Sequence, residues 1–387
     1  MKNHSFTQIR YWRVSVPYLE EWTASPEFGV HPNSDRLILE LRDSEGNTGW
    51  GEGPWRLSNE ETSAALRTLL SKTPAALRPA FLDTLWTPGQ QYWHQPPPPS
   101  SLTPPLENLR HRLRHPLQVA VETAIVDLQT RYLGVPFSSH FGGAWRDRVL
   151  SDYWMGRTTP EHAARCARRG VELGFRGLKL KTTLEDPNVE RLEAIKDSAG
   201  DAFSVTVDPN GRFYRLDDAL STLKAMDAVG NMRIIEDAFP RTALAETREL
   251  RGRLNARVVV HIDPPESLAE ALSAQCCGGL NIDSHAQGLF QWRLQAAAAD
   301  QFNLPVWHGS GLDLGIYTAA QLHLAAATPN CQLPGDQAGP WLRRSTLIHE
   351  PFEVKDGAIL VPFGPGLGIT PDLDAIDRFT VGKALLE

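Results

Sequence analysis

Two short stretches, Gly177-Leu-Lys-Leu-Lys181 and Ser204-Val-Thr-Val-Asp208, decide the fold of this chain. Each is an apolar or β-branched run that ends in a charged residue and precedes a segment of helical period. Eight such runs recur between residues 149 and 345, namely Leu150–Trp154, Gly177–Lys181, Ser204–Asp208, Arg233–Glu236, Arg257–Asp263, Gly279–Asp283, Leu304–His308 and Cys331–Leu333. This alternation predicts a (β/α)8 barrel. A doubly wound open sheet is the alternative, but neither a GxGxxG fingerprint nor a Walker loop supports it.

The segments on either side of the barrel predict a second, smaller domain. Strand-like alternation near Gln8–Val16 and over Arg36–Asp43 indicates an antiparallel sheet, and the aperiodic stretch Tyr18–Ser34 predicts a lid loop. Phe352–Pro362 predicts a hairpin with an Asp-Gly turn. We therefore expect an N-terminal α+β capping domain at residues 1–145, the catalytic barrel at 146–345, and a C-terminal segment, 346–387, that returns to complete the capping sheet.

Composition excludes several classes of protein. The 387 residues are 41% hydrophobic and 22% charged, with a formal net charge of −7, so the chain suits a globular fold and no overall positive field attracts nucleic acid. No stretch approaches the length of a membrane span, and the N-terminus has no signal-peptide pattern. Four cysteines without CxxC spacing are expected to be buried thiols of a reducing compartment. We expect a cytoplasmic protein with no nucleic-acid or membrane partner.

Charged residues stand at the carboxyl ends of successive predicted strands, which is where barrel enzymes place their active sites. The carboxylates among them are Asp208, Glu236 and Asp263, on three consecutive strands. Three converging negative charges repel each other unless a divalent cation neutralises them, and an all-oxygen ligand set suits Mg²⁺. The alternative is that each acid caps a helix or lies in a surface loop.

Lys179 and Lys181 lie two residues apart on one strand and therefore share a face. If that face lines the barrel, neighbouring positive charges lower the lysine pKa towards the range of a general base. In the other register both lysines point outward beneath the helices.

Histidines accompany these residues on the later strands. His308, with Asp283 at the end of the neighbouring strand, predicts a dyad in which the carboxylate orients the imidazole. His308 could instead be a core residue beside Trp307. His285 competes for the same space, and His261 shares a face with Asp263, so it is a candidate for the metal site.

Several segments together resemble the enolase superfamily, in its mandelate racemase and muconate lactonizing enzyme branch. They are Lys179-Leu-Lys181, Asp208-Pro-Asn210, Glu236-Asp237, His261-Ile-Asp263, Gly49-Trp-Gly-Glu-Gly53 and Pro362-Phe-Gly-Pro-Gly-Leu-Gly368. The resemblance implies a Mg²⁺ enzyme that removes the proton α to a carboxylate and stabilises an enediolate on the metal. It also implies frequent homo-oligomers, and we expect one here.

Strand six separates the activities within this branch. The resemblance implies a second catalytic lysine there in muconate lactonizing enzymes and dipeptide epimerases, but this chain has Asn281-Ile-Asp283. An aspartate on strand six with a histidine on strand seven is similar to mandelate racemase and to sugar-acid dehydratases. Strand eight, by contrast, ends in Gln332-Leu-Pro-Gly-Asp336 without the expected glutamate.

These features predict a Mg²⁺-dependent lyase that dehydrates a sugar acid to a 2-keto-3-deoxy acid. The predicted metal ligands are Asp208, Glu236 and Asp263, and the predicted catalytic residues are Lys179, Lys181, His308 and Asp283. Further candidates for contact with the small carboxylate substrate are Asn210, Trp22, Trp154, His261 and His285. A racemase or epimerase of a 2-hydroxy acid, aromatic if the tryptophans line the site, is the second hypothesis, and a non-catalytic acid-binding barrel is the third.

Overall fold

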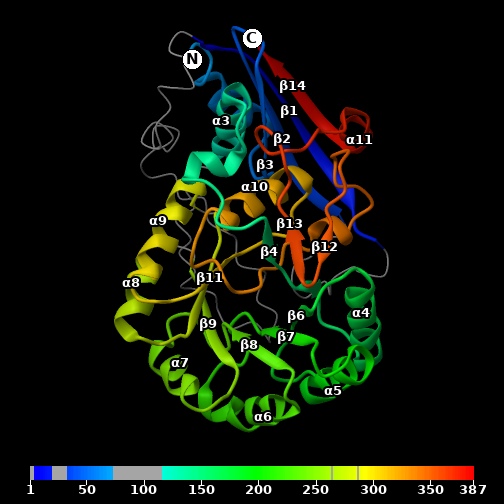
Figure 1. Ribbon diagram of the computed structural model, residues 1–387, viewed down its shortest axis with the longest axis vertical. Coiled ribbons are helices and arrows are strands. Elements are labelled where there is room, and N and C mark those ends of the chain that lie inside the picture. The colour runs from blue at the N-terminus through cyan, green and yellow to red at the C-terminus, as the bar shows by residue number, and fades with distance from the viewer. Residues whose placement is uncertain (1–3, 20–32, 73–115, 263–264, 286) are drawn as a thin grey trace.

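The computed structural model describes residues 4–19, 33–72, 116–262, 265–285 and 287–387. Two bodies are apparent, a curved sheet with its helices and a larger ring of strands surrounded by helices (Figure 1). Trp22, Asp263, and most of the predicted lid loop lie outside the described residues. Among the described residues, no helix is both long and apolar enough to cross a lipid bilayer.

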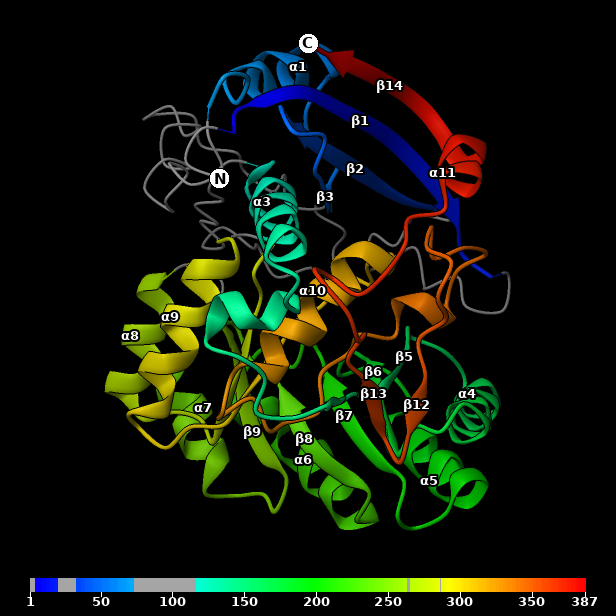
Figure 2. The same cartoon turned by 45° about the horizontal axis from the view of Figure 1, so that its top comes forward.

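The capping sheet has four antiparallel strands in the order β14-β1-β2-β3. They are β1 (Phe6–Pro17), β2 (Asn33–Asp43), β3 (Thr48–Pro54) and β14 (Thr380–Leu386). The last strand of the chain therefore completes the N-terminal sheet, as predicted, and it lies beside β1 in both ribbon views (Figures 1 and 2). Helices α1 (Asn59–Arg67), α3 (Gln118–Leu133) and α11 (Leu373–Phe379) accompany the sheet.

Helix α3 packs closely on β3 because glycines line the contact. A Cβ atom on Gly49 would lie 2.0 Å from the carbonyl oxygen of Ala124, and one on Gly51 would lie 1.9 Å from that of Ala120. Only glycine allows two backbones to approach so closely. The Gly49-Trp-Gly-Glu-Gly53 segment thus holds the capping sheet against α3 and fixes the position of Glu52 beneath it.

The second body is a parallel barrel. Its seven-stranded sheet comprises β5 (Tyr153–Met155), β6 (Gly177–Lys181), β7 (Ser204–Asp208), β8 (Met232–Glu236), β9 (Arg257–Ile262), β10 (Gly279–Ile282) and β11 (Val306–His308), in sequence order. The helices around it are α4 (Pro160–Glu172), α5 (Asn188–Ala199), α6 (Leu216–Val229), α7 (Leu244–Arg251), α8 (Pro265–Ala274), α9 (Leu289–Asp300) and α10 (Gly315–Ala326). The predicted (β/α)8 barrel is confirmed, and the bounds of β6 and β7 are those predicted, Gly177–Lys181 and Ser204–Asp208.

The eighth position of the barrel ring, which we call its eighth stave, is not the regular strand Cys331–Leu333 that the sequence predicted. Residues 331–335 close the ring through isolated parallel bridges, Cys331 with Val306 on one side and Gly335 with Ser151 on the other. Proline at position 334 cannot donate a ladder hydrogen bond, which explains why no longer strand forms here.

A third, three-stranded sheet corrects two boundary predictions. The Asp356-Gly357 turn joins β12 (Val354–Lys355) to β13 (Ala358–Leu360), and both turn residues have positive φ, as a tight hairpin requires. This hairpin pairs with β4 (Arg148–Leu150) instead of returning to the capping sheet. The predicted first barrel strand is therefore split, since Leu150 belongs to β4 and Tyr153 begins β5.

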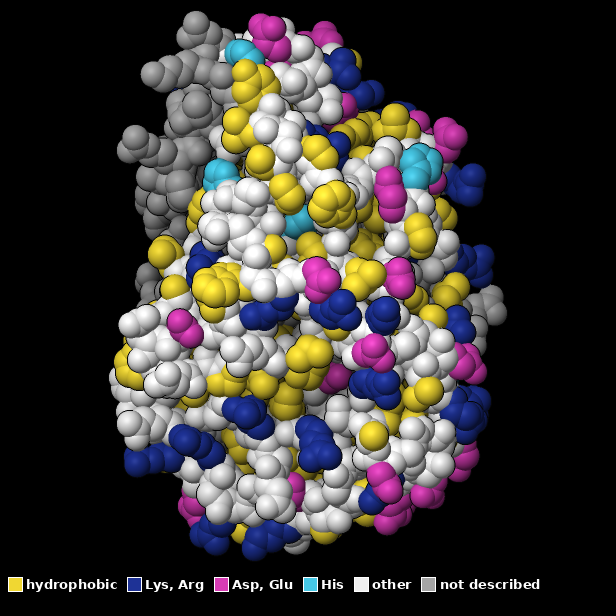
Figure 3. All heavy atoms as spheres, in the orientation of Figure 1, with side chains coloured by type: hydrophobic (Ala, Val, Ile, Leu, Met, Phe, Trp, Pro, Cys, Tyr) yellow, Lys and Arg dark blue, Asp and Glu magenta, His cyan; other side chains and the backbone are white. Residues whose placement is uncertain are grey.

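The described residues also form two short 3-10 turns, η5 (Phe137–Phe141) and η6 (Gly339–Trp341). All four cysteines are free and buried, as the sequence predicted. On the molecular face shown in Figure 3, basic side chains are scattered among polar and acidic ones over the barrel half, without merging into one field.

Candidate active site

Lys179 occupies the centre of the barrel mouth. Its Nζ atom lies 3.1 Å from Asp208 Oδ2, 2.7 Å from Glu236 Oε2 and 3.1 Å from Asp336 Oδ2, and its side chain is 4% exposed. Both lysines therefore face the lumen, as the favoured register predicted. Burial alone would lower the pKa of Lys179, but Asp336, Glu236 and Asp208 raise it well above its usual value. The expected lowering does not occur at this lysine, which stays charged.

Lys181, two residues further along β6, is the more accessible of the two lysines. It donates hydrogen bonds to Asp208 and, over 3.0 Å, to Asn210 Oδ1, and its side chain is 17% exposed. Asn210 adopts positive φ, which asparagine tolerates, and its backbone amide donates to Asp208 Oδ1 over 3.0 Å. Lys181 is thus held at the surface of the cavity by partners that leave one side of its ammonium group open.

The carboxylates of the mouth outnumber its two lysines. Burial raises the pKa of Glu236 to about 7, helped by the charge of Asp208, and burial raises the pKa of Asp152 to about 7. The pKa of Asp336 is raised for the same reason, whereas Lys181 and Lys179 overcome the effect of burial and lower that of Asp208. The raised pKa values of Glu236, Asp152 and Asp336 indicate a deficit of positive charge at the mouth.

His261 lies beside this group. One ligand atom each from Glu236, Asp237 and His261 fall within 4.8 Å of one another, and His261 Nδ1 lies 3.7 Å from Glu236 Oε1. Asp237 is already engaged, because it accepts hydrogen bonds from the His261 backbone amide and from Arg241. The structure thus brings His261 to the predicted metal site, and Asp263, two residues on, lies outside the described residues.

Strand β10 contributes Asn281 and Asp283. The side chain of Asn281 donates to Glu236 Oε1 over 2.6 Å, so this residue faces the lumen. Asp283, two residues later, continues on the same face at the mouth. Its Oδ1 atom accepts hydrogen bonds from the backbone amide of His285 over 2.8 Å and from the ring Nδ1 of His285 over 2.5 Å.

The predicted dyad of Asp283 and His308 is wrong. Trp307 faces the lumen, where its ring lies 5.8 Å from Lys179 Nζ, so the alternation of β11 turns His308 outward. There the imidazole stacks on Trp292 at 4.9 Å and its ring nitrogens contact Ser284 and the Gly309 carbonyl. His308 is 1% exposed, and burial lowers its pKa to about 4. It is a core histidine, the alternative that the sequence left open.

Trp154 is in register with Lys179 on the neighbouring strand, and it is buried. It therefore lines the lumen beneath the mouth. Polar side chains surround Lys179 at the mouth, and Trp154 adds an apolar surface beneath them.

Three comparisons with known proteins bear on this arrangement. The sequence pattern of the family described as "Enolase C-terminal domain-like" matches residues 161–375, more than half of the chain. The chain belongs to the enolase superfamily. Its relatives place it in the mandelate racemase and muconate lactonizing enzyme branch.

Two sequence relatives and one solved structure illustrate this placement. The chain is 28% identical to an N-succinylamino acid racemase of Thermus thermophilus over 92% of each chain. It is 29% identical to muconate cycloisomerase 1 of Rhodococcus opacus, over 68% of this chain and 72% of that one. The structure of a dipeptide epimerase from Cytophaga hutchinsonii, complexed with Mg and a dipeptide, superposes with a TM-score of 0.80 at 19% identity, covering 99% of this chain and 100% of that one.

Enolase-superfamily enzymes use Mg²⁺, and the residues of this chain fit such an ion. Asp208 and Glu236 present oxygen atoms from adjacent strands, which is the ligand type Mg²⁺ prefers. The raised pKa values of Glu236, Asp152 and Asp336 show that the mouth has room for more positive charge than two lysines supply. These residues therefore suit the cation that the superfamily employs.

Several residues of this superfamily site were missed by sequence reasoning. Asp152 and Asp336 reach Lys179 and its neighbours from staves one and eight, and the Thr206 hydroxyl donates to Asp152 over 2.7 Å. Their only sequence signal is a position at or near the end of a stave. Asp313 and the capping residue Arg36 were also missed, because each belongs to a contact between distant parts of the chain.

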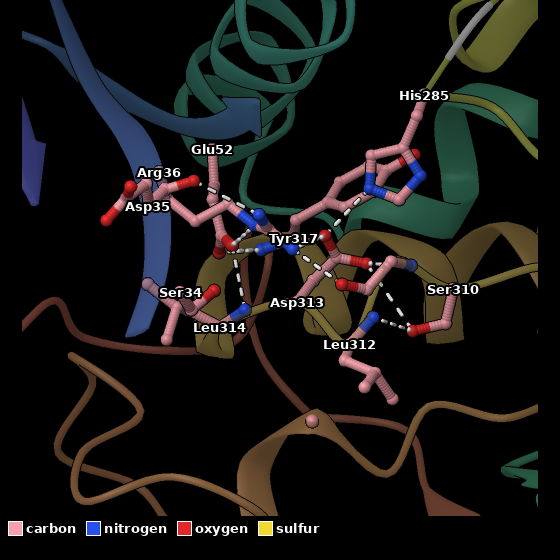
Figure 4. Close-up of polar contacts among 12 residues, drawn as sticks. Ser34, Asp35, Arg36, Glu52, His285, Ser310, Leu312, Asp313, Leu314 and Tyr317 are labelled. Atoms are coloured by element: carbon pink, nitrogen blue, oxygen red, sulfur yellow. Dashed lines mark hydrogen bonds and ion pairs between the residues drawn. The ribbon is translucent and has the colours of Figure 1, made fainter. Parts of the chain in front are cut away.

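These two residues belong to a network between the capping sheet and the barrel (Figure 4). Asp313 Oδ1 accepts from His285 Nε2 over 2.7 Å and lies 3.4 Å from Arg36 Nη2. Glu52 is fully buried, and its carboxylate accepts hydrogen bonds from the backbone amides of Leu314 and Tyr317, at the start of α10, over 2.7 and 2.9 Å. Capping sheet and barrel are thereby joined at the edge of the active site.

Proposed function

We propose that this chain is a Mg²⁺-dependent lyase in which Lys181 removes the α-proton of a small hydroxylated carboxylate, which then loses water. The observation that carries the proposal is the contrast across the barrel mouth. Lys181 is partly accessible on one side, whereas the position after β10, where a second lysine would serve a two-base isomerase, is Asp283.

The substrate carboxylate fits the end of the mouth that holds Lys179 and Lys181. Asp208 and Glu236 would hold Mg²⁺ there, with His261 close to the second of them. The bound ion would supply the charge that stabilises negative charge developing on the carboxylate oxygens. Lys179 remains protonated between three carboxylates and adds a fixed positive charge, so its role is electrostatic and it does not take up a proton.

Proton transfer then falls to Lys181 in its unprotonated form. Its amine takes the proton from C2 of the substrate, and the electron pair of the C–H bond moves toward the carboxylate. When the C3–O bond breaks, the Lys181 ammonium returns a proton to the departing hydroxide and water leaves. The remaining enol becomes the 2-keto-3-deoxy acid. Lys181 ends the cycle as it began, so atoms and charges balance without a second base.

A racemase or epimerase is the second candidate. Among the relatives that align over more than nine-tenths of the chain, two named N-succinylamino acid racemases and one named L-Ala-D/L-Glu epimerase favour it, whereas two others are named o-succinylbenzoate synthases. Such a reaction needs proton delivery to the opposite face of the substrate, which Asp283 would have to provide.

The two candidates are separated by ¹H NMR of the Mg²⁺-loaded protein in D₂O with aldonic, uronic, aldaric, aromatic 2-hydroxy and N-acylamino acids. A 2-keto-3-deoxy product from a hydroxylated acid supports the proposed lyase. Inversion at C2 without loss of water supports the racemase instead. If no acid reacts or exchanges its α-proton, the enzymatic proposal is wrong and the binding-barrel hypothesis replaces it.

A further inference from the structure

The side of the barrel mouth beside β10 carries a carboxylate, that of Asp283, whose position is fixed by hydrogen bonds. In the sheet order, β6 and β10 are four staves apart, and the ring has eight staves when residues 331–335 are included. Lys181, the last residue of β6, and Asp283, directly after β10, therefore lie on opposite sides of the mouth. Both side chains are partly accessible, at 17% and 18%.

His285 holds this carboxylate. Its Nδ1 contacts Asp283 and its Nε2 contacts Asp313, so both ring nitrogens donate when the imidazole is protonated. Burial alone would lower the pKa of His285, but Asp283 and Asp313 raise it to about 10. In return, His285 outweighs the effect of burial and lowers the pKa of Asp283. With both of its N–H groups occupied, His285 is a clamp and has no proton free for a substrate.

Asp313 is fixed in turn from several elements. Its Oδ2 atom accepts from the Gly311 amide over 3.0 Å and from Gln321 Nε2 over 2.9 Å, and Arg36 from the capping strand β2 approaches its Oδ1. Tyr317 on α10 also faces His285, with ring centroids 4.6 Å apart, and the neutral His308 lies behind Tyr317. Arg36 and Arg56 place positive charge beside Asp313 and Asp283, respectively. Figure 4 shows the His285 ring beside that of Tyr317, with a dashed line from His285 to Asp313.

His285 engages one of the two oxygens of Asp283. Both hydrogen bonds that Asp283 accepts from the ring and backbone of His285 end on Oδ1, and Arg56 lies close enough for its positive charge to act on this carboxylate. An ionised carboxylate repels another carboxylate and accepts hydrogen bonds strongly. A substrate whose carboxylate lies at the lysine end would therefore present donor groups to Asp283.

We propose that Asp283 is a specificity-determining residue that accepts a hydrogen bond from a hydroxyl group beyond C3 of the substrate, and that His285 and Asp313 are its positioning residues. This inference rests on the proposed function, since it assumes that a hydroxylated acid lies across the mouth. It assigns aldonic acids of four to six carbons as the substrate class and gives Asp283 no part in proton transfer.

Binding to an inactive background tests the inference first. Lys181→Met is combined with Asp283→Ala or Asp283→Asn, and calorimetry with Mg²⁺ measures binding of the hexonic acid that the wild-type enzyme dehydrates and of glycerate, which has no hydroxyl beyond C3. Asp283→Ala should weaken binding of the hexonic acid by about 10- to 100-fold, the range for a hydrogen bond to a charged group, and binding of glycerate by less than about 3-fold. Asp283→Asn, which keeps one acceptor oxygen, should fall between.

His285→Gln tests the clamp. It should cause the same selective loss for the hexonic acid, and in wild type the His285 ring signals, assigned by their absence from this variant, should remain those of an imidazolium at pH 8.5 in ¹H–¹⁵N NMR.

Three results would overturn the inference. The first is an equal loss of binding affinity for both acids in Asp283→Ala. The second is a neutral His285 at pH 7. The third is a preference for an acid bearing an ammonium group, if Asp283→Ala abolishes that preference. If wild type neither exchanges nor dehydrates any acid, the proposed function itself fails. This outcome is distinct from the three above, because it is measured on the wild-type protein alone.

Discussion

Removing Lys179 should expose how strongly the carboxylates of the mouth depend on positive charge. Lys179→Met leaves Asp208, Glu236 and Asp336 without the ammonium group that lies within 3.1 Å of each. Loss of one partner from a buried charge cluster costs about 3–5 kcal/mol. Lys181→Met is the matched control, because that side chain is partly exposed and contacts one carboxylate and one amide, so its loss should cost about 1 kcal/mol.

The assay is urea unfolding of wild type and both variants, in EDTA and again with Mg²⁺. Lys179→Met should lose about 3–5 kcal/mol in EDTA and regain more stability than wild type when Mg²⁺ is added, because a divalent cation replaces the missing charge. Equal stability of Lys179→Met and Lys181→Met in EDTA would refute the assignment of the buried charge cluster. A Mg²⁺ effect identical in all three proteins would refute the metal position.

Three further predictions concern the surroundings of the site. Contacts in the folded protein raise the pKa of His285 to about 10, so this residue adds stability that is complete below its unfolded pKa near 6.5 and is lost as the pH rises through 10. The free energy of unfolding of wild type should therefore fall by about 3–5 kcal/mol from pH 6 to 10.5. An equal fall in His285→Gln would contradict this prediction. Gly51→Ala should cost about 3 kcal/mol or more by urea unfolding, because the new Cβ would lie 1.9 Å from Ala120 O; stability within 1 kcal/mol of wild type would show that the contact yields. His308→Leu should lower stability by about 1–3 kcal/mol yet keep α-proton exchange by NMR, and its loss from a folded variant would restore His308 to the mechanism.

The ladder of charged residues could be predicted from sequence because it follows from two local rules. Strand alternation fixes which side chains share a face, and parallel strands in a barrel bring their carboxyl ends together. Lys179, Lys181, Asp208 and Glu236 meet in the structure for these reasons, and the enolase-superfamily resemblance rests on the same residues.

His308 shows where those rules stop. Two adjacent residues at the end of β11 face opposite ways, and only packing decides that Trp307 enters the lumen while His308 stacks on Trp292. The sequence cannot rank these registers, because an aromatic residue suits either side. The true partner of Asp283, His285, lies in the following loop, whose path depends on tertiary contacts.

Long-range contacts account for the other omissions. Asp313 meets Arg36 across the junction of the barrel and the capping sheet, and Asp336 reaches Lys179 from a stave that forms only isolated bridges. Nothing periodic marks such residues. The hairpin at 354–360 was predicted from its Asp-Gly turn, but its partner strand β4 was not, since pairing of distant segments leaves no local pattern.

The most direct test of the central claim compares α-proton exchange in wild type and Lys181→Met, by ¹H NMR in D₂O with Mg²⁺ and the acid that wild type converts. We predict that wild type loses the C2–H signal as the 2-keto-3-deoxy product appears, and that Lys181→Met, folded and still able to bind the acid, shows neither exchange nor product. Exchange that continues in Lys181→Met would contradict the account, because another group would then remove the proton.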